Sequence, residues 1–267
     1  MTELLLDAPD PYFTHASGYH VRLAASQADV VAAQQLRDRV FADECGAATP
    51  GPDGLDRDEF DDRCDHLIVW SHDRGSATPH AIATCRLLPP HSNDAAPRGA
   101  GLYANREFGL MPLERLLNST VEAGRGCVHP DHRSGAAVSL LAGGLARYLH
   151  LTGYRNLLGC ASMDLADGGS NAAAFWDLAL TSHLTPAERR CRPRAPIAIG
   201  GLPRADQPTV PALLRGYLRV GAKVCGPPAY GQMPCSADFL MLLDLRDANL
   251  RYVRRFLGGT RPGSATA

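Results

Sequence analysis

Three arginines stand within predicted helices and strands. Arg37 lies one helical turn before Phe41, Arg86 lies in the strand-like run 81–88 that should otherwise be apolar, and Arg125 follows a glycine in the glycine-broken strand 120–128. Burying a charged side chain costs free energy unless an opposite charge pairs with it. These positions therefore predict carboxylate partners, and arginine suits them because its planar fork binds a carboxylate through two parallel hydrogen bonds.

Carboxylates are present at matching positions. Asp58 and Asp61 lie in an acidic loop, and Glu122 precedes Arg125 by three residues. One interpretation is a buried network of the three arginines and three carboxylates that stabilises the fold. The other is a pocket that these charges shape around a charged substrate.

The number and kind of charged residues exclude several mechanisms. The 267 residues include 27 basic and 28 acidic side chains, yet the only lysine is Lys223. A Gly-Lys-Ser/Thr phosphate loop is therefore absent, and a Schiff-base enzyme would have to use Lys223. A net charge of −1 argues against bulk binding of nucleic acid. The charge is uneven, with a net −5 over residues 53–65 and a net +4 over residues 186–204.

Common catalytic and metal motifs are also missing. The chain has no G-x-S-x-G, G-x-G-x-x-G, H-E-x-x-H or H-x4-D pattern. The nearest metal set, Cys127-x-His129-x-x-His132, does not have a standard ligand spacing, so we expect no metal site. Cys127 beside His129 fits a thiolate nucleophile, although a cysteine at a strand end more often packs in the core.

These residues must be positioned by strands and helices that alternate along the chain. The patterns predict strands at 20–24, 66–70, 81–88, 120–128, 156–161, 223–225 and 239–244. They predict helices near 27–44, 105–117, 134–151, 171–182 and 212–220, and a final arginine-bearing helix. Glycine breaks within 120–128 indicate a β-bulge.

This order predicts a single α/β (α+β) domain over residues 19–260, with an insertion at about 164–210. Residues 1–18 are expected to be a loose leader and residues 261–267 a flexible tail. The N-terminus lacks the basic region of a signal peptide, and the eight cysteines show no CxxC pair. No apolar run is long enough to span a membrane, so the expected location is the cytoplasm.

The charged motifs resemble those of acyl-homoserine-lactone synthases, in order and in spacing. The shared patterns are R-x-x-x-F, D-x-x-D, C-R-L-L-P and E-x-x-R, carried by Arg37 and Phe41, Asp58 and Asp61, Arg86, and Glu122 and Arg125. Longer stretches, such as LRDRVFADECGA and EAGRGCVHPDHRSGAAVSLLAGGLARYL, resemble ornithine–acyl-carrier-protein N-acyltransferases still more closely. Lactone synthases usually have a tryptophan where Gly46 and Ala47 stand, which favours the ornithine-lipid branch.

Both families resemble the GNAT superfamily, which implies a mixed, mostly antiparallel sheet flanked by helices. The resemblance also implies that a pantetheine arm enters between strands 120–128 and 156–161. The turn and helix start that follow would hold its phosphate with backbone N–H groups, and the β-bulge would hold the oxyanion. The residues assigned to these two roles are Gly124, Cys127, Val128, Arg133, Gly135 and Ala136.

Acyl transfer to an amine needs a base, because an ammonium must lose its proton before it can attack a thioester. Glu122 is the first candidate, with a salt bridge to Arg125 or Arg86 as its structural alternative. His129 is the second, with a capping role as its alternative. Tyr217 would protonate the leaving thiolate, or it packs in the core.

The implied reaction moves a long, 3-hydroxylated acyl group from acyl carrier protein, or from acyl-CoA, to ornithine. Asp58 and Asp61 would bind the side-chain ammonium of the acceptor and Arg86 its carboxylate. Arg37 and Phe41 complete the expected substrate-binding set. No cofactor is expected to be bound permanently. The arginine clusters fit an acidic carrier protein, a peripheral membrane contact or a solvated loop. An N-acyl amino acid or lactone synthase and a non-catalytic acyl-binding protein are the alternatives.

Overall fold

The computed structural model describes residues 18–45, 52–72, 78–90, 101–133, 135–231 and 235–248. Most of the predicted leader, the predicted tail, the final helix and the pair Gly46–Ala47 lie outside these residues. In chain order, the elements that position the site are β1 (Tyr19–Leu23), α2 (Gln27–Cys45), β2 (Asp65–Ser71), β3 (His80–Leu88), β4 (Phe108–Gly109), α3 (Glu114–Leu117), β5 (Thr120–Val128), α4 (Ala136–Thr152), β6 (Asn156–Asp164), α5 (Ser170–Leu178), β7 (Arg192–Pro193), α6 (Ala212–Val220), β8 (Lys223–Val224), β9 (Ala229–Tyr230) and β10 (Ser236–Asp244).

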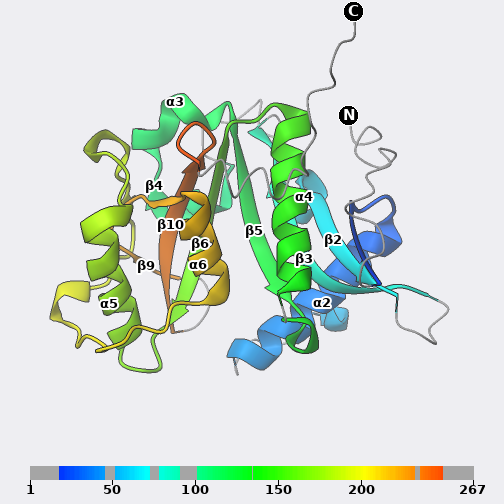
Figure 1. Cartoon of the computed structure of the whole chain (residues 1–267), viewed down its shortest axis with the longest axis horizontal. Coiled ribbons are helices and arrows are strands. Elements are labelled where there is room, and N and C mark those ends of the chain that lie inside the picture. The colour runs from blue at the N-terminus through cyan, green and yellow to red at the C-terminus, as the bar shows by residue number, and fades with distance from the viewer. Residues whose placement is uncertain are drawn as a thin grey trace, which may run out of the picture.

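A single large sheet forms the centre of the fold, in the order β1-β2-β3-β5-β6-β10-β8, with β9 beside β10 (Figure 1). Every adjacent pair is antiparallel except β5 and β6, which are parallel. The mixed, mostly antiparallel sheet predicted from the sequence is therefore confirmed.

Helices cover both faces of the sheet because the apolar side chains of its strands point alternately to one face and to the other. On β2, Leu67 and Val69 pack in the core beneath α4, whereas Ile68 and Trp70 pack beneath α2. Helices α5 and α6 pack on the same face as α4, at the β6–β10 side of the sheet. A third apolar cluster lies on the opposite face, under the segment 101–117.

Strands β5 and β6 pair over only part of their length. The parallel register runs from Thr120 opposite Asn156 to Glu122 opposite Leu158, although each strand continues for six more residues. Gly159 lies where the pairing ends, and a Cβ there would stand 2.6 Å from the backbone oxygen of Ala123. The two strands therefore separate beyond this point, as the family resemblance implies.

The predicted bulge lies on β5. The register with β3 passes from Gly124 opposite Arg86 to Cys127 opposite Thr84, so two residues of β5 face Cys85 alone. Arg125 is one of the two, and its φ of 50° is unusual for a residue with a side chain. Bulges of this kind re-aim side chains beside functional sites.

The helix predicted near residues 105–117 is wrong as a single element. The segment forms two short 3-10 turns, the strand β4 and the single turn α3. Gly109 and Pro112 interrupt a longer helix because neither supports continuous helical hydrogen bonding. Strand β4 pairs instead with β7 of the insertion, through the partners Phe108 and Pro193.

Candidate functional site

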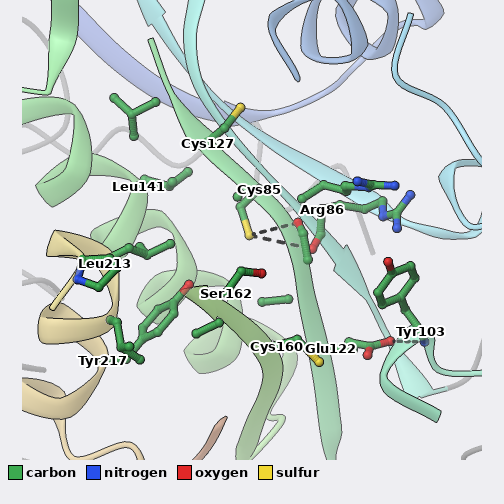
Figure 2. Close-up of a pocket in the computed structure, with 18 of the residues that line it drawn as sticks. Cys85, Arg86, Tyr103, Glu122, Cys127, Leu141, Cys160, Ser162, Leu213 and Tyr217 are labelled. Carbon is green, nitrogen blue, oxygen red and sulfur yellow. Dashed lines mark hydrogen bonds between the residues drawn. The ribbon is translucent and has the colours of Figure 1, made fainter. Parts of the chain in front are cut away.

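A cavity of about 530 Å³ lies where β5 and β6 separate, and its lining comes from both faces of the sheet (Figure 2). Leu141 of α4 and Leu213 and Tyr217 of α6 line it from one face. Tyr103 and Glu122 line it from the other. The cavity therefore joins an apolar face to a charged one across the sheet.

The charged face is held by a buried ion network. Arg37 is fully buried, and its Nη2 donates to Asp61 Oδ1 at 2.7 Å. Arg86 Nη1 donates to Asp58 Oδ1 at 2.6 Å and to Asp61 Oδ2 at 3.0 Å. Burial alone would raise the pKa of Asp61, but the charges of Arg37 and Arg86 and a backbone N–H lower it below its usual value.

This geometry differs from the predicted acceptor-binding role of three residues. Arg37, Asp58 and Asp61 are not among the residues that line the cavity, because they are bound to one another behind its wall. Arg86 and Phe41 do line it. The structural interpretation of the network is confirmed for these two arginines and two aspartates. Both oxygens of Asp61 accept hydrogen bonds from arginines, whereas Asp58 Oδ2 has no hydrogen-bond partner among the described residues and lies 3.8 Å from Arg125 Nη2.

Glu122 stands apart from this network. It forms no ion pair within the described part of the chain, so its predicted salt bridge with Arg125 or Arg86 is wrong. Its Oε2 accepts from the backbone N–H of Tyr103 at 2.7 Å, and its Oε1 from that of Ala104 at 2.6 Å. Burial raises the pKa of Glu122 to about 7, despite these two hydrogen bonds. A carboxylate with this pKa exchanges protons near neutral pH, as a general base must.

Arg125 lines the cavity at the edge of the ion network. Its side chain is 26% exposed and forms two long ion pairs, each of 3.8 Å, with Asp56 and Asp58, without a hydrogen bond to either. The guanidinium lies 5.7 Å from the ring centre of Phe41 and 6.0 Å from that of Tyr103. The cavity also takes in Gly124 and Gly126, which flank Arg125 on the bulge.

The residues expected to hold the donor phosphate or the oxyanion divide into two groups. Gly124, Cys127, Val128 and Arg133 line the cavity, and Arg133 Nε donates to the backbone oxygen of Val128 at 3.2 Å. Gly135 and Ala136 begin α4 outside the lining, and the φ of Gly135 is +96°, a conformation that glycine adopts without strain.

His129 also lies outside the cavity lining. Its ring accepts a hydrogen bond from the backbone N–H of Asp131, so it caps the short turn 130–132. Its ring packs edge to face against His132. The capping interpretation of His129 is therefore confirmed, and Glu122 is the base candidate that faces the cavity.

Tyr217 extends from α6 toward the bulge of β5 (Figure 2). Burial raises the pKa of its hydroxyl above the ordinary tyrosine value, and the nearby Cys85 thiol adds to the shift. The hydroxyl is protonated at neutral pH, as in any tyrosine, and the shift makes it a weaker acid. Its candidacy as a proton donor therefore depends on its position in the cavity lining.

Sequence patterns missed three residues of the site. Asp56, one of the acidic residues of 53–65, forms an ion pair of 3.7 Å with Arg37. Tyr103 comes from an irregular segment with no local signal. Asp238 lines the cavity, and its signal was available because it is a buried charge within the apolar strand 236–244.

The arginines of the insertion are largely bound within the chain. Arg189 lies 3.4 Å from Asp244, Arg194 donates to Asn105 Oδ1 at 3.1 Å, and Arg204 donates to Asp177 at 2.9 Å. Among the described residues, no group of three or more His, Cys, Asp or Glu side chains is arranged to bind a metal. None of the described helices is long and apolar enough to cross a bilayer.

Comparison with known proteins finds that this chain is similar to acyltransferases. A family described as Acetyltransferase (GNAT) domain matches residues 36–143. An L-ornithine N(alpha)-acyltransferase of Rhodobacter capsulatus is 35% identical over 237 residues, which cover 84% of this chain and 89% of the relative. Another, of Brucella abortus, is 30% identical over 257 residues, which cover 87% of this chain and 86% of the relative.

A solved structure is similar in fold. The structure of BjaI, a CoA-dependent acyl-homoserine lactone synthase solved with SAM and isopentyl-CoA, aligns with a TM-score of 0.50 at 16% identity, covering 90% of this chain and 88% of that one. At that identity the likeness concerns the fold.

Proposed function

Because the chain belongs to the L-ornithine N(alpha)-acyltransferase family, we propose that it acylates the α-amine of ornithine. The acyl group that we propose is long-chain and 3-hydroxylated, the donor is acyl carrier protein, and the product is lyso-ornithine lipid. The observation that carries this proposal is the cavity across the sheet, which has Glu122 at its charged face and Tyr217 at its apolar face.

The charged face suits the acceptor amine. With a pKa of about 7, Glu122 is partly ionised at neutral pH and able to take the proton of an α-ammonium, directly or through a water. The neutral amine then attacks the thioester carbon, and the carbonyl oxygen becomes an oxyanion. Backbone N–H groups of the bulge around Gly124–Cys127 are the proposed donors to that oxyanion. Arg125 is the proposed partner of the acceptor carboxylate.

The apolar face suits the thioester arm of the donor. Val138, Leu141 and Leu213 provide an apolar wall, and Arg133, three residues before α4, also lines the cavity. When the tetrahedral intermediate collapses, the C–S bond breaks and the thiolate takes a proton from Tyr217, while the second proton of the attacking nitrogen restores the tyrosine hydroxyl. Tyr217 is proposed for this role because it lines the apolar face of the cavity.

The overall reaction is tested by incubating the purified chain with ornithine and each of two donors, 3-hydroxyacyl carrier protein and the matching acyl-CoA. Mass spectrometry should find N-acylornithine, with the carrier protein as the better donor. S-adenosylmethionine, glycine and glutamine serve as competing acceptors. Acyl-homoserine lactone as the main product would favour the lactone-synthase alternative. Binding of the acyl donor without turnover would favour a non-catalytic acyl-binding protein.

Replacing Tyr217 by phenylalanine should lower kcat by about 10²-fold and leave the KM for the donor nearly unchanged. The reason is that the leaving thiolate loses its proton donor, whereas the apolar ring stays in place. Steady-state kinetics measure both constants. Tyr154→Phe is the matched control, because Tyr154 is also buried but does not line the cavity. Equal kcat values for the two variants would assign Tyr217 to packing.

A further inference from the structure

Two buried aspartates of β10 differ in their partners. Asp238 and Asp244 are each 5% exposed, and their even spacing points them to the same face of the strand. Asp244 accepts from Arg246 Nε at 2.9 Å and lies 3.4 Å from Arg189. Asp238 has no basic side chain within ion-pair distance among the described residues, and Ser236 Oγ donates to its Oδ1 at 3.1 Å. Asp244 thus forms ion pairs within the chain, whereas Asp238 has no basic partner among the described residues.

The uncompensated carboxylate faces the cavity. Asp238 is part of the lining, and the backbone of Gly231 closes its Oδ1 side, since a Cβ on Gly231 would lie 2.5 Å from that oxygen. The other oxygen, Oδ2, has no hydrogen-bond partner in the described part of the chain and is the one left toward the cavity. A buried carboxylate without a partner is costly, so a ligand that supplies a cation would be stabilised here.

The wall around Asp238 is negative. Asp238 pairs in register with Ser162 of β6, and Cys160, two residues earlier on that strand, lines the same cavity. Burial raises the pKa of the Cys160 thiol, and the nearby charges of Glu107 and Asp238 add to the shift. The arginines of this face lie elsewhere: Arg86 is already bound to aspartates, and Arg125 lies on the bulge of β5.

We infer that Asp238 binds the side-chain ammonium of the amino-acid acceptor and thereby selects a diamino acid. The inference deepens the proposed function and rests on it. It replaces the role expected for Asp58 and Asp61, which do not line the cavity and form ion pairs with the network arginines. The acceptor would then lie between Arg125 and Asp238, with Glu122 serving its α-amine.

The test compares ornithine with norvaline, which has the same carbon chain and no side-chain ammonium. In the wild type we expect ornithine to be strongly preferred. Asp238→Asn should lower kcat/KM for ornithine by about 10²-fold, mainly through KM, and leave that for norvaline unchanged. The ornithine-to-norvaline ratio is the kcat/KM for ornithine divided by that for norvaline. If this ratio is the same in the variant as in the wild type, the inference is overturned.

Asp244→Asn is the matched control, because it removes the other buried carboxylate of β10. It should lower the Tm, since Arg246 and Arg189 lose their partner, and keep the ornithine-to-norvaline ratio of the wild type. Without ligand, Asp238→Asn should have a Tm no lower than the wild type, because it removes an unpaired buried charge. An equal fall of the ratio in both variants would mean a general structural effect and reject the inference.

Asp238→Glu provides a rescue, because it moves the carboxylate one methylene further into the cavity. The preference should shift from ornithine toward 2,4-diaminobutyrate, whose side chain is one methylene shorter. If the wild type does not acylate ornithine at all, the proposed function fails. Calorimetric titration of ornithine and norvaline then still decides the inference without turnover: tighter ornithine binding that is lost in Asp238→Asn supports it, and equal binding of both by the wild type overturns it.

Discussion

Replacing Glu122 by glutamine is expected to lower kcat for acyl transfer by about 10²- to 10⁴-fold, the usual contribution of a general base. Glutamine keeps the shape of the side chain and one acceptor oxygen for the backbone N–H groups of Tyr103 and Ala104. It cannot take a proton from the acceptor. Steady-state kinetics with saturating donor and acceptor measure the effect.

The pH profile separates catalysis from structure. Burial raises the pKa of Glu122 to about 7, and the active form of a base is the deprotonated one. Wild-type kcat/KM, which reports the free enzyme, should therefore rise with pH through about 7, and this limb should be missing from Glu122→Gln. Any limb caused by the amine of the substrate remains in both proteins.

Glu122→Asp is the companion variant, since it keeps the charge but withdraws it by one methylene. It should retain a pH-dependent limb at a kcat between those of the wild type and Glu122→Gln. A Glu122→Gln variant with wild-type kcat and pH profile would contradict the assignment. Glu122 would then serve only to hold the backbone of the segment 103–104.

Replacing Arg37 by methionine should lower the free energy of unfolding by about 3 kcal/mol. Arg37 is fully buried and binds Asp61, so its loss leaves a buried carboxylate without one of its partners. The expected value lies at the low end for a buried pair because Arg86 still binds the other oxygen of Asp61. For a chain of this size the Tm should fall by roughly 10 °C, as measured by circular dichroism.

Two further variants make the Arg37 prediction specific. Arg57→Met removes an exposed pair with Asp53, whose side chains are 53% and 77% exposed, and should change stability by less than about 1 kcal/mol. The double variant Arg37→Met/Asp61→Asn should recover part of the loss, because it removes the orphaned charge. If Arg37→Met instead kept its Tm and raised the KM for the acceptor, Arg37 would be a binding residue.

Local sequence patterns predicted most elements because their signals lie within a few neighbouring residues. The amphipathic pattern of 134–151 corresponds to α4, and the glycine breaks of 120–128 correspond to the bulge of β5. The segment 105–117 was predicted wrongly because its strand β4 is stabilised by β7, more than 80 residues away. A two-residue strand of this kind has no local pattern.

The family and its chemistry were also accessible from sequence, since they depend on the types and spacings of Arg37, Asp61, Arg86 and Glu122. The comparisons confirm that resemblance and the N-acyltransferase family. The spacing of the motifs does not say which charges pair. Asp61 lies between two arginines that are 49 residues apart in the chain, and only the folded sheet brings them to it.

The sequence by itself predicted that three arginines and several carboxylates lie together, because a charge within a helix or strand of the core requires an opposite partner. The tertiary structure decided how these charges are used. It binds Arg37, Arg86, Asp58 and Asp61 to one another and leaves Glu122 and Asp238 facing the cavity. Partnership between charges depends on distances across strands, which the spacing along one strand does not contain.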